Sequence, residues 1–504
     1  MFKGQPKGLF ALALANTGER FGYYTMLAVF ALFLRANFGL EAGTAGAIYS
    51  SFLMLVYFMP LLGGIFADKF GFGKMVTIGI SIMFIGYLLL SVPLGGDTLA
   101  MIAMLIALLL ISVGTGLFKG NLQVMVGNLY DDPQYASKRD SGFSLFYMAI
   151  NIGALFAPTA AVKIKEWAEF SLGFSGNDAY HFSFAVACAA LILSICIYYI
   201  FRPTFRHVEG GERKKGEAAV EDTLTPAETK SRMTALFLVF AVVIFFWMAF
   251  HQNGLTLTYF ADEFTEKTSS GLQSMAFNVW NLVLVIIGVY GTFSIFQSES
   301  TRGKFISAGV VAAVIAILVY KYLHLSGPIS VSAPIFQQFN PFYVVALTPV
   351  SMAIFSALAA KKKEPSAPRK IAYGMLVAGA GFIVMAIASL GLLTPDAQKT
   401  AGDAATFCSA NWLISTYLVL TFAELLLSPM GISFVSKVAP PKYKGMMMGC
   451  WFVATALGNL LVSVGGFLWG NIPLWIVWSV FTGLCLLSAL FMFAMMKKLE
   501  AATK

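Results

Sequence analysis

Five ionisable side chains interrupt long apolar stretches of this sequence: Glu19, Arg20, Lys119, His251 and Glu424. Each costs about 2.5–3.5 kcal/mol at the centre of a membrane helix on insertion scales, so such residues usually face a wet cavity. Because they lie on different stretches, they indicate a pathway for ions or for a charged substrate. A purely structural ion pair, for instance Arg20 with a carboxylate, is the alternative interpretation.

The first apolar stretch, "ANTGERFGYYTM" followed by "LAVFALFL", carries a polar stripe. A four-three-four spacing puts the members of this stripe on one helix face: Asn16, Arg20, Tyr23 and Leu27. Glu19 and Tyr24 flank the face. A polar stripe on a membrane helix must turn away from lipid, so we expect it to line the centre of the protein.

The stretches that hold these residues make the chain an all-α polytopic membrane protein. Of its 504 residues, 58% are hydrophobic and 12% are charged, whereas a soluble domain carries about a quarter charged residues. Apolar runs of about 18 residues or more recur throughout, and each is long enough to cross a bilayer. The short alternating segments of a β-barrel are missing from the sequence. No cleavable signal is expected, because "MFKGQPKG" leads directly into a full-length span.

We expect fourteen spans, near residues 8–36, 43–67, 75–94, 98–126, 141–163, 178–201, 233–260, 273–296, 305–324, 340–360, 370–394, 407–434, 445–469 and 473–496. Counted on alternate sides, about 26 of the 34 Lys and Arg residues fall on the side that holds both termini, and about six on the other. Basic loops remain in the cytoplasm. This asymmetry predicts a multi-pass protein of the cell inner membrane with both termini cytoplasmic.

Residues 202–232 are polar and divide the chain into two parts. We expect an N-terminal six-helix bundle over 1–201, a flexible cytoplasmic linker over 202–232 and a C-terminal bundle over 233–504. Two six-helix bundles are the layout of major facilitator transporters. The two surplus spans form a hairpin at about 273–324, which we interpret as a packing or oligomer-facing element without a transport role.

The stretch "GGIFADKFGFGK" joins the second and third spans and resembles the cytoplasmic loop signature of that superfamily. The matching positions are Gly64, Asp68, Gly71 and Lys74. Glycine permits a tight turn, and Asp68 is suited to cap or pair with a neighbouring helix end and so to latch one conformation. An ordinary charged loop is the alternative.

The five cysteines are scattered in or near apolar segments: Cys188, Cys196, Cys408, Cys450 and Cys485. No CxxC pair occurs, so we interpret them as small core residues rather than as disulfides or metal ligands. The net charge of +9 comes from the loops and does not indicate nucleic acid. No cofactor or metal is expected.

Six stretches resemble the proton-coupled oligopeptide transporters, a major facilitator family. "GERFGYY" resembles the family's first helix, "GTGLFKGN" its fourth, "SGFSLFYMAINIGALFAP" its fifth and "FFWMAFHQNGLTLTYFAD" its seventh. "FNPFYVVALTP" is similar to the eighth, and "FAELLLSPMGISFVSKVAPPKYKGMMMGCW" to the tenth and eleventh. The resemblance covers nearly the whole chain except about 263–338.

The resemblance implies a site for short peptides, whose ends carry an ammonium and a carboxylate. It implies that Glu424, with Asn340 and Asn151, holds the ammonium, and Lys119 is suited to hold the carboxylate. The aromatic side chains expected to form walls are Tyr23, Tyr24, Tyr57, Trp247 and Trp451, for each of which plain core packing is the alternative. Ser428 lies in the same tenth-helix motif.

Three positions depart from the family's pattern. The leading acid of its first helix is Asn16 here, the trailing arginine is Leu27, and the seventh-helix acid is His251. With two acids and one base lost, we expect Lys119 to pair with Glu19 when the site is empty. Only Glu19, Glu424 and His251 remain to titrate, and an imidazole, with an unperturbed pKa near 6.5, is a candidate replacement proton carrier. A neutral histidine that only forms hydrogen bonds is the alternative.

These features predict a non-enzymatic secondary transporter that imports di- and tripeptides as a proton symporter by alternating access. Its expected partners are peptides, protons and membrane lipid, and it is expected to be a monomer. The alternatives are transport of nitrate, an amino-acid derivative or a peptide-like drug on the same fold, or a proton-independent facilitator. A membrane-embedded enzyme or a nutrient receptor is a weaker alternative, because the sequence has no HExxH motif and no nucleophile elbow.

Overall fold

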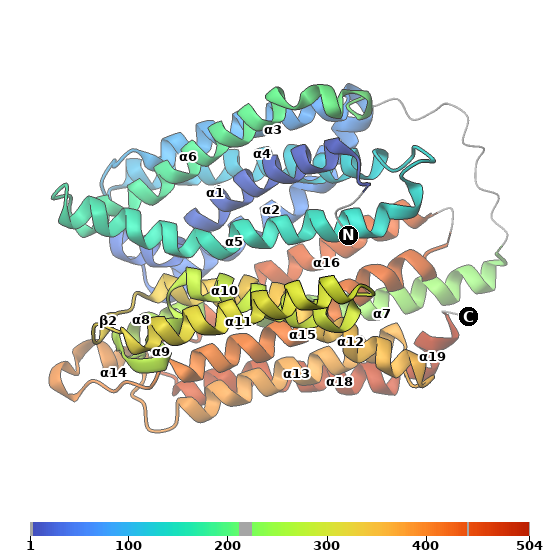
Figure 1. Ribbon diagram of the computed structural model, residues 1–504. Helices are drawn as coiled ribbons and strands as arrows, with labels where there is room; N and C mark the ends of the chain where they lie inside the picture. The colour runs from blue at the N-terminus through green and yellow to red at the C-terminus, as the bar shows by residue number, and fades with distance from the viewer. Residues whose placement is uncertain (1–3, 211–223, 441–442, 503–504) are drawn as a thin grey trace.

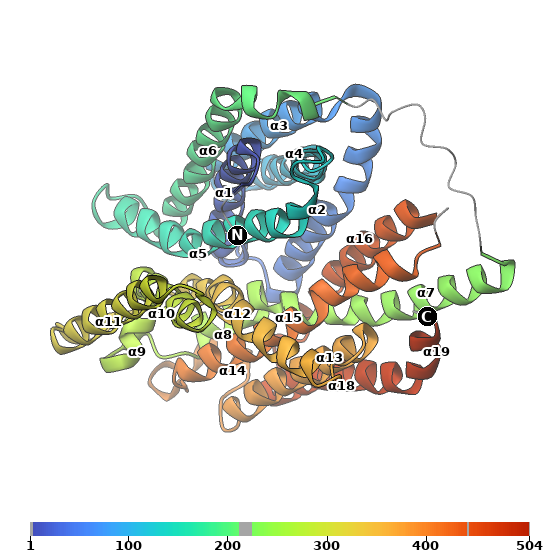
Figure 2. The ribbon, with the colours of Figure 1, turned by 45° about the vertical axis from the view of Figure 1, so that its right-hand side comes forward.

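The computed structural model describes residues 4–210, 224–440 and 443–502, and these residues contain fourteen helices long and apolar enough to cross a membrane. The predicted number of spans is confirmed. The first six are α1 (Lys7–Phe38), α2 (Ala42–Phe70), α3 (Phe72–Ser91), α4 (Thr98–Asn128), α5 (Arg139–Phe170) and α6 (Gly176–Ile200). They gather in one bundle, drawn in blue to green in Figures 1 and 2.

The remaining spans form the second bundle and the inserted hairpin. The bundle contains α7 (Pro226–Phe250), the 3-10 turn η4 (His251–Gly254), α8 (Thr256–Glu263), the 3-10 segment η5 (Ala333–Gln338), α12 (Phe339–Ala360), α13 (Ala367–Ala388), α15 (Asn411–Val438), α16 (Lys444–Leu460), α17 (Ser463–Phe467) and α18 (Leu474–Ala494). Short connecting elements are η1 (Ala136–Lys138), α14 (Pro395–Thr400), η6 (Gly402–Ala404) and α19 (Met496–Ala501). Thus α7 with α8, and α16 with α17, are spans that are each interrupted along their length.

Local sequence explains where several helices begin and turn. The Asp97 side chain accepts the Ala100 amide at 2.8 Å at the start of α4, and Thr225 with Glu228 forms a capping box at the start of α7. The link between α2 and α3 is the single residue Gly71, whose φ of +95° is open to glycine but strained for other residues.

Glycine also lets neighbouring helices approach closely within the first bundle. A Cβ atom added at Gly79 of α3 would lie 2.7 Å from the carbonyl oxygen of Gly114 on α4. Small residues at such crossings are typical of membrane helices, which gain stability mainly from close packing rather than from exclusion of water. The α3–α4 contact is therefore sensitive to any larger side chain at either position.

The inserted hairpin consists of α10 (Val279–Gln297) and α11 (Thr301–Leu323), preceded by the short helix α9 (Gly271–Ala276). A two-stranded antiparallel ribbon of β1 (Thr268–Ser269) and β2 (Ile329–Ser330) closes its base. In Figure 2 the hairpin lies at the edge of the second bundle, with α11 outermost. Among the described residues of α11, Val314 alone is buried.

The predicted linker over 202–232 differs from the structure at both ends. Its first residues form two 3-10 turns, η2 (Arg202–Thr204) and η3 (Arg206–Val208), that pack on the first bundle through the buried Phe205. At the other end, α7 already begins at Pro226 because of the capping box at Thr225. The flexibility predicted for residues 211–223 lies outside the described residues.

The cysteines are free thiols, but they are not all core residues. Cys188 and Cys485 are buried, Cys408 and Cys450 are half-buried, and Cys196 is exposed on α6. The prediction of a core position is therefore wrong for Cys196, because an outward-facing position on a membrane helix accepts a small apolar side chain equally well.

Candidate functional site

Glu19 and Arg20 form a buried ion pair on α1. The Arg20 Nε and Nη2 atoms donate to the two carboxylate oxygens of Glu19, each at 2.5 Å, and the Arg20 guanidinium lies 4.5 Å from the centroid of the Tyr23 ring. Both charged side chains are at most 2% exposed. The charge of Glu19 is therefore balanced by its own neighbour in the chain.

Lys119 of α4 does not pair with Glu19, so this prediction is wrong. Because Arg20 occupies both Glu19 oxygens, the Lys119 ammonium lies instead over the ring of Tyr57 on α2, with Nζ 4.6 Å from the ring centroid. A cation over an aromatic face gains about 0.5–2 kcal/mol and keeps its charge available to a further partner. Lys119 is half-buried.

Glu424 of α15 has neutral partners. The Nδ2 atom of Asn340 on α12 donates to the Glu424 Oε2 atom at 3.0 Å and to the Thr421 hydroxyl at 3.1 Å. The structure thus brings Asn340 and Glu424 together, both of which we had selected from the sequence. Asn151 on α5 donates from Nδ2 to the backbone oxygen of Tyr147 at 3.0 Å, so its amide is used within its own helix.

His251 lies at the point where α7 gives way to η4. Its ring stacks on Trp247, with centroids 5.1 Å apart and planes at 24°, and its centroid is 6.0 Å from that of Tyr57. Its Nδ1 atom is hydrogen-bonded to the Oδ1 atom of Asn459 on α16. Sequence reasoning did not find Asn459, because no local motif marks it and it lies 208 positions away.

The aromatic residues selected from the sequence fall into two groups. Tyr23, Tyr24, Tyr57 and Trp247 surround the charged residues, and the Tyr23 and Tyr24 rings meet edge to face at 5.2 Å. Trp451 is buried and fills the space over Gly431, where a Cβ atom would collide with its ring. Its packing therefore favours the core interpretation.

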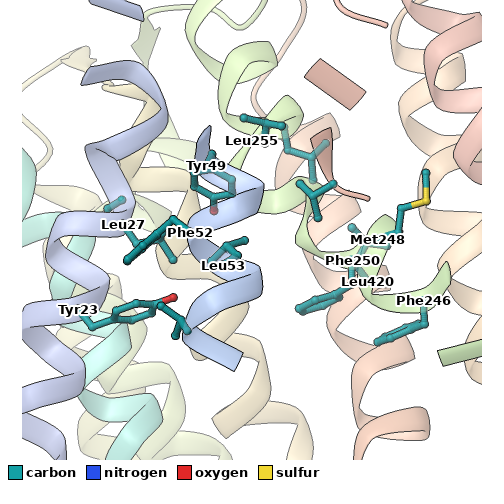
Figure 3. Packing of buried hydrophobic residues seen from close by; sticks show 14 of the residues in the cluster. Tyr23, Leu27, Tyr49, Phe52, Leu53, Phe246, Met248, Phe250, Leu255 and Leu420 are labelled. Carbon is teal, nitrogen blue, oxygen red and sulfur yellow. The ribbon is translucent and has the colours of Figure 1, made fainter. Parts of the chain in front are cut away.

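Four buried polar atoms around this region have no hydrogen-bond partner within the described residues: the Tyr23 hydroxyl, the Trp247 Nε1, the Ser428 hydroxyl and the Nδ2 atom of Asn459. Buried polar groups normally have partners, so these atoms are candidates for contact with a substrate or water. Figure 3 shows apolar side chains of the buried cluster, with Tyr23 and Leu27 of the first helix beside Phe52 of α2, and Phe250 of the second bundle on the far side of α2 in this view. Leu27, which departs from the family pattern, belongs to this apolar cluster.

The two bundles are tied together at the end of the molecule away from the chain termini (Figure 1). Arg35 near the end of α1 forms an ion pair with Glu263 at the end of α8, and Glu263 also accepts from the Trp469 Nε1 at 3.0 Å. The Tyr259 hydroxyl donates to the Ala42 carbonyl at 3.3 Å. Sequence reasoning missed this contact, because charges at helix ends resemble ordinary loop charges.

The segment η5 adds two further ties at the same end. Gln337 donates to the Ala28 carbonyl of α1 at 3.1 Å, and the Thr159 hydroxyl of α5 donates to Gln338 Oε1 at 3.1 Å. The backbone that leaves the inserted hairpin therefore contacts the first bundle directly before it enters α12.

The loop signature lies at the end that holds the termini. Gly71 makes the turn between α2 and α3, and a Cβ atom at Gly64 would meet open space. Asp68 is exposed and does not cap α3, whose N-cap is Gly71. With Lys74, Arg202 and others it lines a cavity of about 400 Å³.

Glu209, rather than Asp68, joins this loop to its neighbours. Its carboxylate accepts from Arg202 and from the Tyr198 hydroxyl at 2.8–3.0 Å. Its backbone oxygen accepts the Gly73 amide at 3.1 Å. The sequence did not indicate this contact, because Glu209 lies in the stretch that composition assigned to the linker.

Comparison with known proteins gives a consistent result along the whole chain. The sequence pattern of the POT family matches residues 73–218 and 322–467, together more than half of the chain. The chain is 30% identical to the uncharacterized transporter YclF of Bacillus subtilis (strain 168), over 94% of this chain and 90% of that one. It is 28% identical to the di-/tripeptide transporter of Lactococcus lactis subsp. lactis (strain IL1403), over 91% and 89%.

Solved structures agree with this match. A POT family transporter in complex with 5-aminolevulinic acid superimposes with a TM-score of 0.76 at 20% identity, covering 99% of this chain and 98% of that one. The peptide transporter POT in complex with sulfate has a TM-score of 0.67 at 26% identity, covering 100% and 96%. The predicted major facilitator fold is confirmed.

Proposed function

This chain belongs to the POT family of membrane transporters, and on that premise we propose that it is a secondary active transporter that imports di- and tripeptides. The names of several relatives support the substrate class, for example the di-/tripeptide transporter of Lactococcus lactis. The observation that carries the proposal is the separation of two opposite charges with neutral neighbours, Lys119 on α4 and Glu424 on α15.

The two ends of a short peptide suit these two charges. The substrate ammonium would replace part of the Asn340 contact and pair with Glu424, and the carboxylate would pair with Lys119, which holds its charge over Tyr57. Glu19 does not compete for the ammonium, because Arg20 already balances it. A peptide held in this way connects the two bundles and favours their closure around it.

Alternating access requires the bundles to separate at one end at a time. The Lys and Arg asymmetry supports cytoplasmic termini and an inner-membrane location. The grouping of the helices in Figures 1 and 2 supports the proposed division into bundles over 1–201 and 233–504 joined by the linker. With that proposed orientation, the Arg35–Glu263 pair and the η5 contacts join the two bundles at the outer end, which supports a state closed to the outside. Import then requires these contacts to break and re-form in each cycle.

Proton symport is the second part of the proposal. His251 occupies the position of the family's seventh-helix acid and lies beside Tyr57 and Lys119, within the candidate site. We propose that His251 carries the coupled proton, with Glu424 and Glu19 as the other titratable groups of the site.

We further propose that the chain acts as a monomer in the lipid bilayer, with the loop around Asp68 assisting the conformational change.

A second candidate substrate class is favoured by one observation. Leu27 replaces the arginine of the family pattern and belongs to the apolar cluster, so Lys119 has lost a neighbouring cation for the carboxylate. A smaller amino-acid derivative also carries one ammonium and one carboxylate, and one structural neighbour was solved with 5-aminolevulinic acid. Proton-independent transport is the corresponding alternative for the mechanism.

Uptake into proteoliposomes tests both parts. Purified protein is reconstituted, and accumulation of labelled dialanine is measured with and without an imposed inward proton gradient. We expect accumulation above equilibrium only with the gradient. We also expect unlabelled tripeptide to compete with dialanine more strongly than 5-aminolevulinic acid or nitrate does. Uptake of 5-aminolevulinic acid without dialanine uptake would favour the second class, and equilibration without gradient-driven accumulation would identify a facilitator.

A further inference from the structure

Two broken helices meet beside the candidate site. α7 gives way to η4 at His251, and α16 ends at Leu460 before α17 begins. Two adjacent residues of η4 join the breaks: His251 Nδ1 bonds to Asn459 Oδ1, and Gln252 Nε2 donates to the Val462 carbonyl at 3.1 Å. Helix breaks line binding sites in many transporters. The imidazole is therefore tied to the break in a second helix.

The surroundings leave the His251 ring little freedom to turn. Trp247 stacks on one face of the ring at a centroid distance of 5.1 Å. Asn459 is 0% exposed. The preceding residue, Gly458, is so close to α7 that an added Cβ atom would lie 2.8 Å from the Trp247 Cβ. Packing thus fixes both partners of the hydrogen bond.

The chemistry of the bond assigns a different role to each ring nitrogen. An amide oxygen only accepts hydrogen bonds, so with Asn459 Oδ1 as its partner the Nδ1 atom of His251 carries a hydrogen. A neutral imidazole then has its lone pair on Nε2. When Nε2 takes a proton, the bond from Nδ1 to Asn459 persists, so the ring changes charge without reorienting.

We propose that Asn459 is a positioning residue for His251, which directs the coupled proton to the Nε2 atom of the imidazole. This inference rests on the proposed symport function. A proton from water on the outer side binds the Nε2 lone pair and gives an imidazolium. The same proton later leaves Nε2 for water on the cytoplasmic side, and no other bond is formed or broken.

The charged and titratable groups around His251 come from four other helices. Tyr57 of α2 contacts both the imidazole and Lys119 of α4, at 6.0 Å and 4.6 Å from its ring centroid. The Glu19–Arg20 pair of α1 is internally balanced, and Glu424 lies on α15. A proton on His251 thus adds a second positive charge beside Lys119. A substrate carboxylate there would meet two cations, which links proton binding to peptide binding.

Three variants of α16 test the proposal in proteoliposomes. Asn459→Leu removes the acceptor at similar volume, Asn459→Asp keeps an acceptor and adds charge, and Thr455→Val is the matched control. Thr455 lies one turn away, is also buried and bonds only to the Trp451 carbonyl within the described residues. Gradient-driven dialanine uptake and gradient-free counterflow are measured between about pH 5.5 and 8, the range in which histidine titrates.

We expect Asn459→Leu to lose gradient-driven accumulation while keeping counterflow, and Asn459→Asp to keep accumulation with its pH midpoint moved up by about one unit, because a carboxylate stabilises the imidazolium. Thr455→Val should keep the parental pH profile. The proposal is overturned if Asn459→Leu keeps the parental profile, or if all three variants lose accumulation and counterflow together.

A second measurement tests the positioning role of Asn459 even if the chain is not proton-coupled. Nitrogen NMR of protein with ¹⁵N-labelled histidine, with the His251 signal assigned by its loss in His251→Gln, reports which ring nitrogen carries hydrogen above pH 8. We expect a protonated Nδ1 in the parent and a mixture of tautomers in Asn459→Leu. Hydrogen on Nε2 in the parent would overturn the positioning role. Hydrogen on Nδ1 without gradient-driven uptake would instead reject the symport proposal alone.

Discussion

The two carboxylates of the central region, the buried Glu19 and the half-buried Glu424, are in contrasting environments. Glu19 on α1 receives two charged hydrogen bonds from Arg20, its neighbour in sequence. Glu424 on α15 receives one hydrogen bond from the neutral amide of Asn340. A carboxylate that is already paired with a cation contributes to stability, whereas one whose partners are neutral is still able to pair with a cationic group of a ligand. The comparison supports a structural role for Glu19 and our proposal that Glu424 binds the substrate.

The largest effect should follow from breaking the Glu19 pair. Arg20→Gln leaves a buried carboxylate without its cation, which typically costs about 3–5 kcal/mol in stability. The thermal midpoint in detergent should fall, and the double variant Glu19→Gln/Arg20→Gln should recover most of the loss. An unchanged midpoint in Arg20→Gln would show that Glu19 is not held as a buried anion.

Glu424→Gln should leave the fold intact and remove binding. Losing one partner of a desolvated charge pair costs about 2–5 kcal/mol, or about 30-fold to several thousand-fold in dissociation constant. Calorimetric titration with dialanine measures the effect, and Glu166→Gln, at a partly exposed residue of α5 that pairs with Lys163, is the matched control. Parental affinity in Glu424→Gln would contradict the binding role.

Lys119→Ala tests the opposite end of the substrate. The loss of a hydrogen bond to a charged group costs about 1.5–3 kcal/mol. Dialanine and N-acetyl-dialanine, which both keep the carboxylate, should lose affinity equally in this variant, whereas dialanine amide should be nearly unaffected. If Lys119→Ala weakened the binding of dialanine amide as much as that of dialanine, the substrate carboxylate would have to bind elsewhere.

The smallest effect should come from the ion pair at the end of the molecule away from the termini. Glu263→Gln removes the charge that ties α8 to Arg35, and partly exposed pairs contribute about 1 kcal/mol or less. We expect up to about a fivefold shift toward the outward-facing state. Spin labels at Leu172 and Leu272, in a background without accessible cysteines, measure this shift. A larger outward-facing population would give a longer distance between the two labels in pulsed electron resonance. A distribution identical to the parent's would contradict a latch at this position.

The sequence predicted those features that depend on local composition. All fourteen spans were found, because length and apolarity are properties of each segment alone. It also identified Asn340 and Glu424, which the structure brings within 3.0 Å, through motifs on two separate helices. The roles of these residues remain predictions.

Other features depend on geometry that composition does not encode. Glu19 had two candidate cations, and the pairing with Arg20 was decided by the side-chain directions of two adjacent residues on one helix. The bonds between His251 and Asn459 and between Arg35 and Glu263 join residues 208 and 228 positions apart. Such pairings follow from the packing of whole helices. The same limitation applies to Glu209, whose contacts arise where η3 folds back onto α6.

The central claim is that opposite charges on the two bundles hold the two ends of a peptide. The most direct test is the binding of three ligands to the parent protein: dialanine, N-acetyl-dialanine and dialanine amide. Removing either charge should weaken binding at least about tenfold, which corresponds to about 1.4 kcal/mol. Equal affinity for all three ligands would contradict the account, because it would show that neither Glu424 nor Lys119 pairs with a peptide terminus.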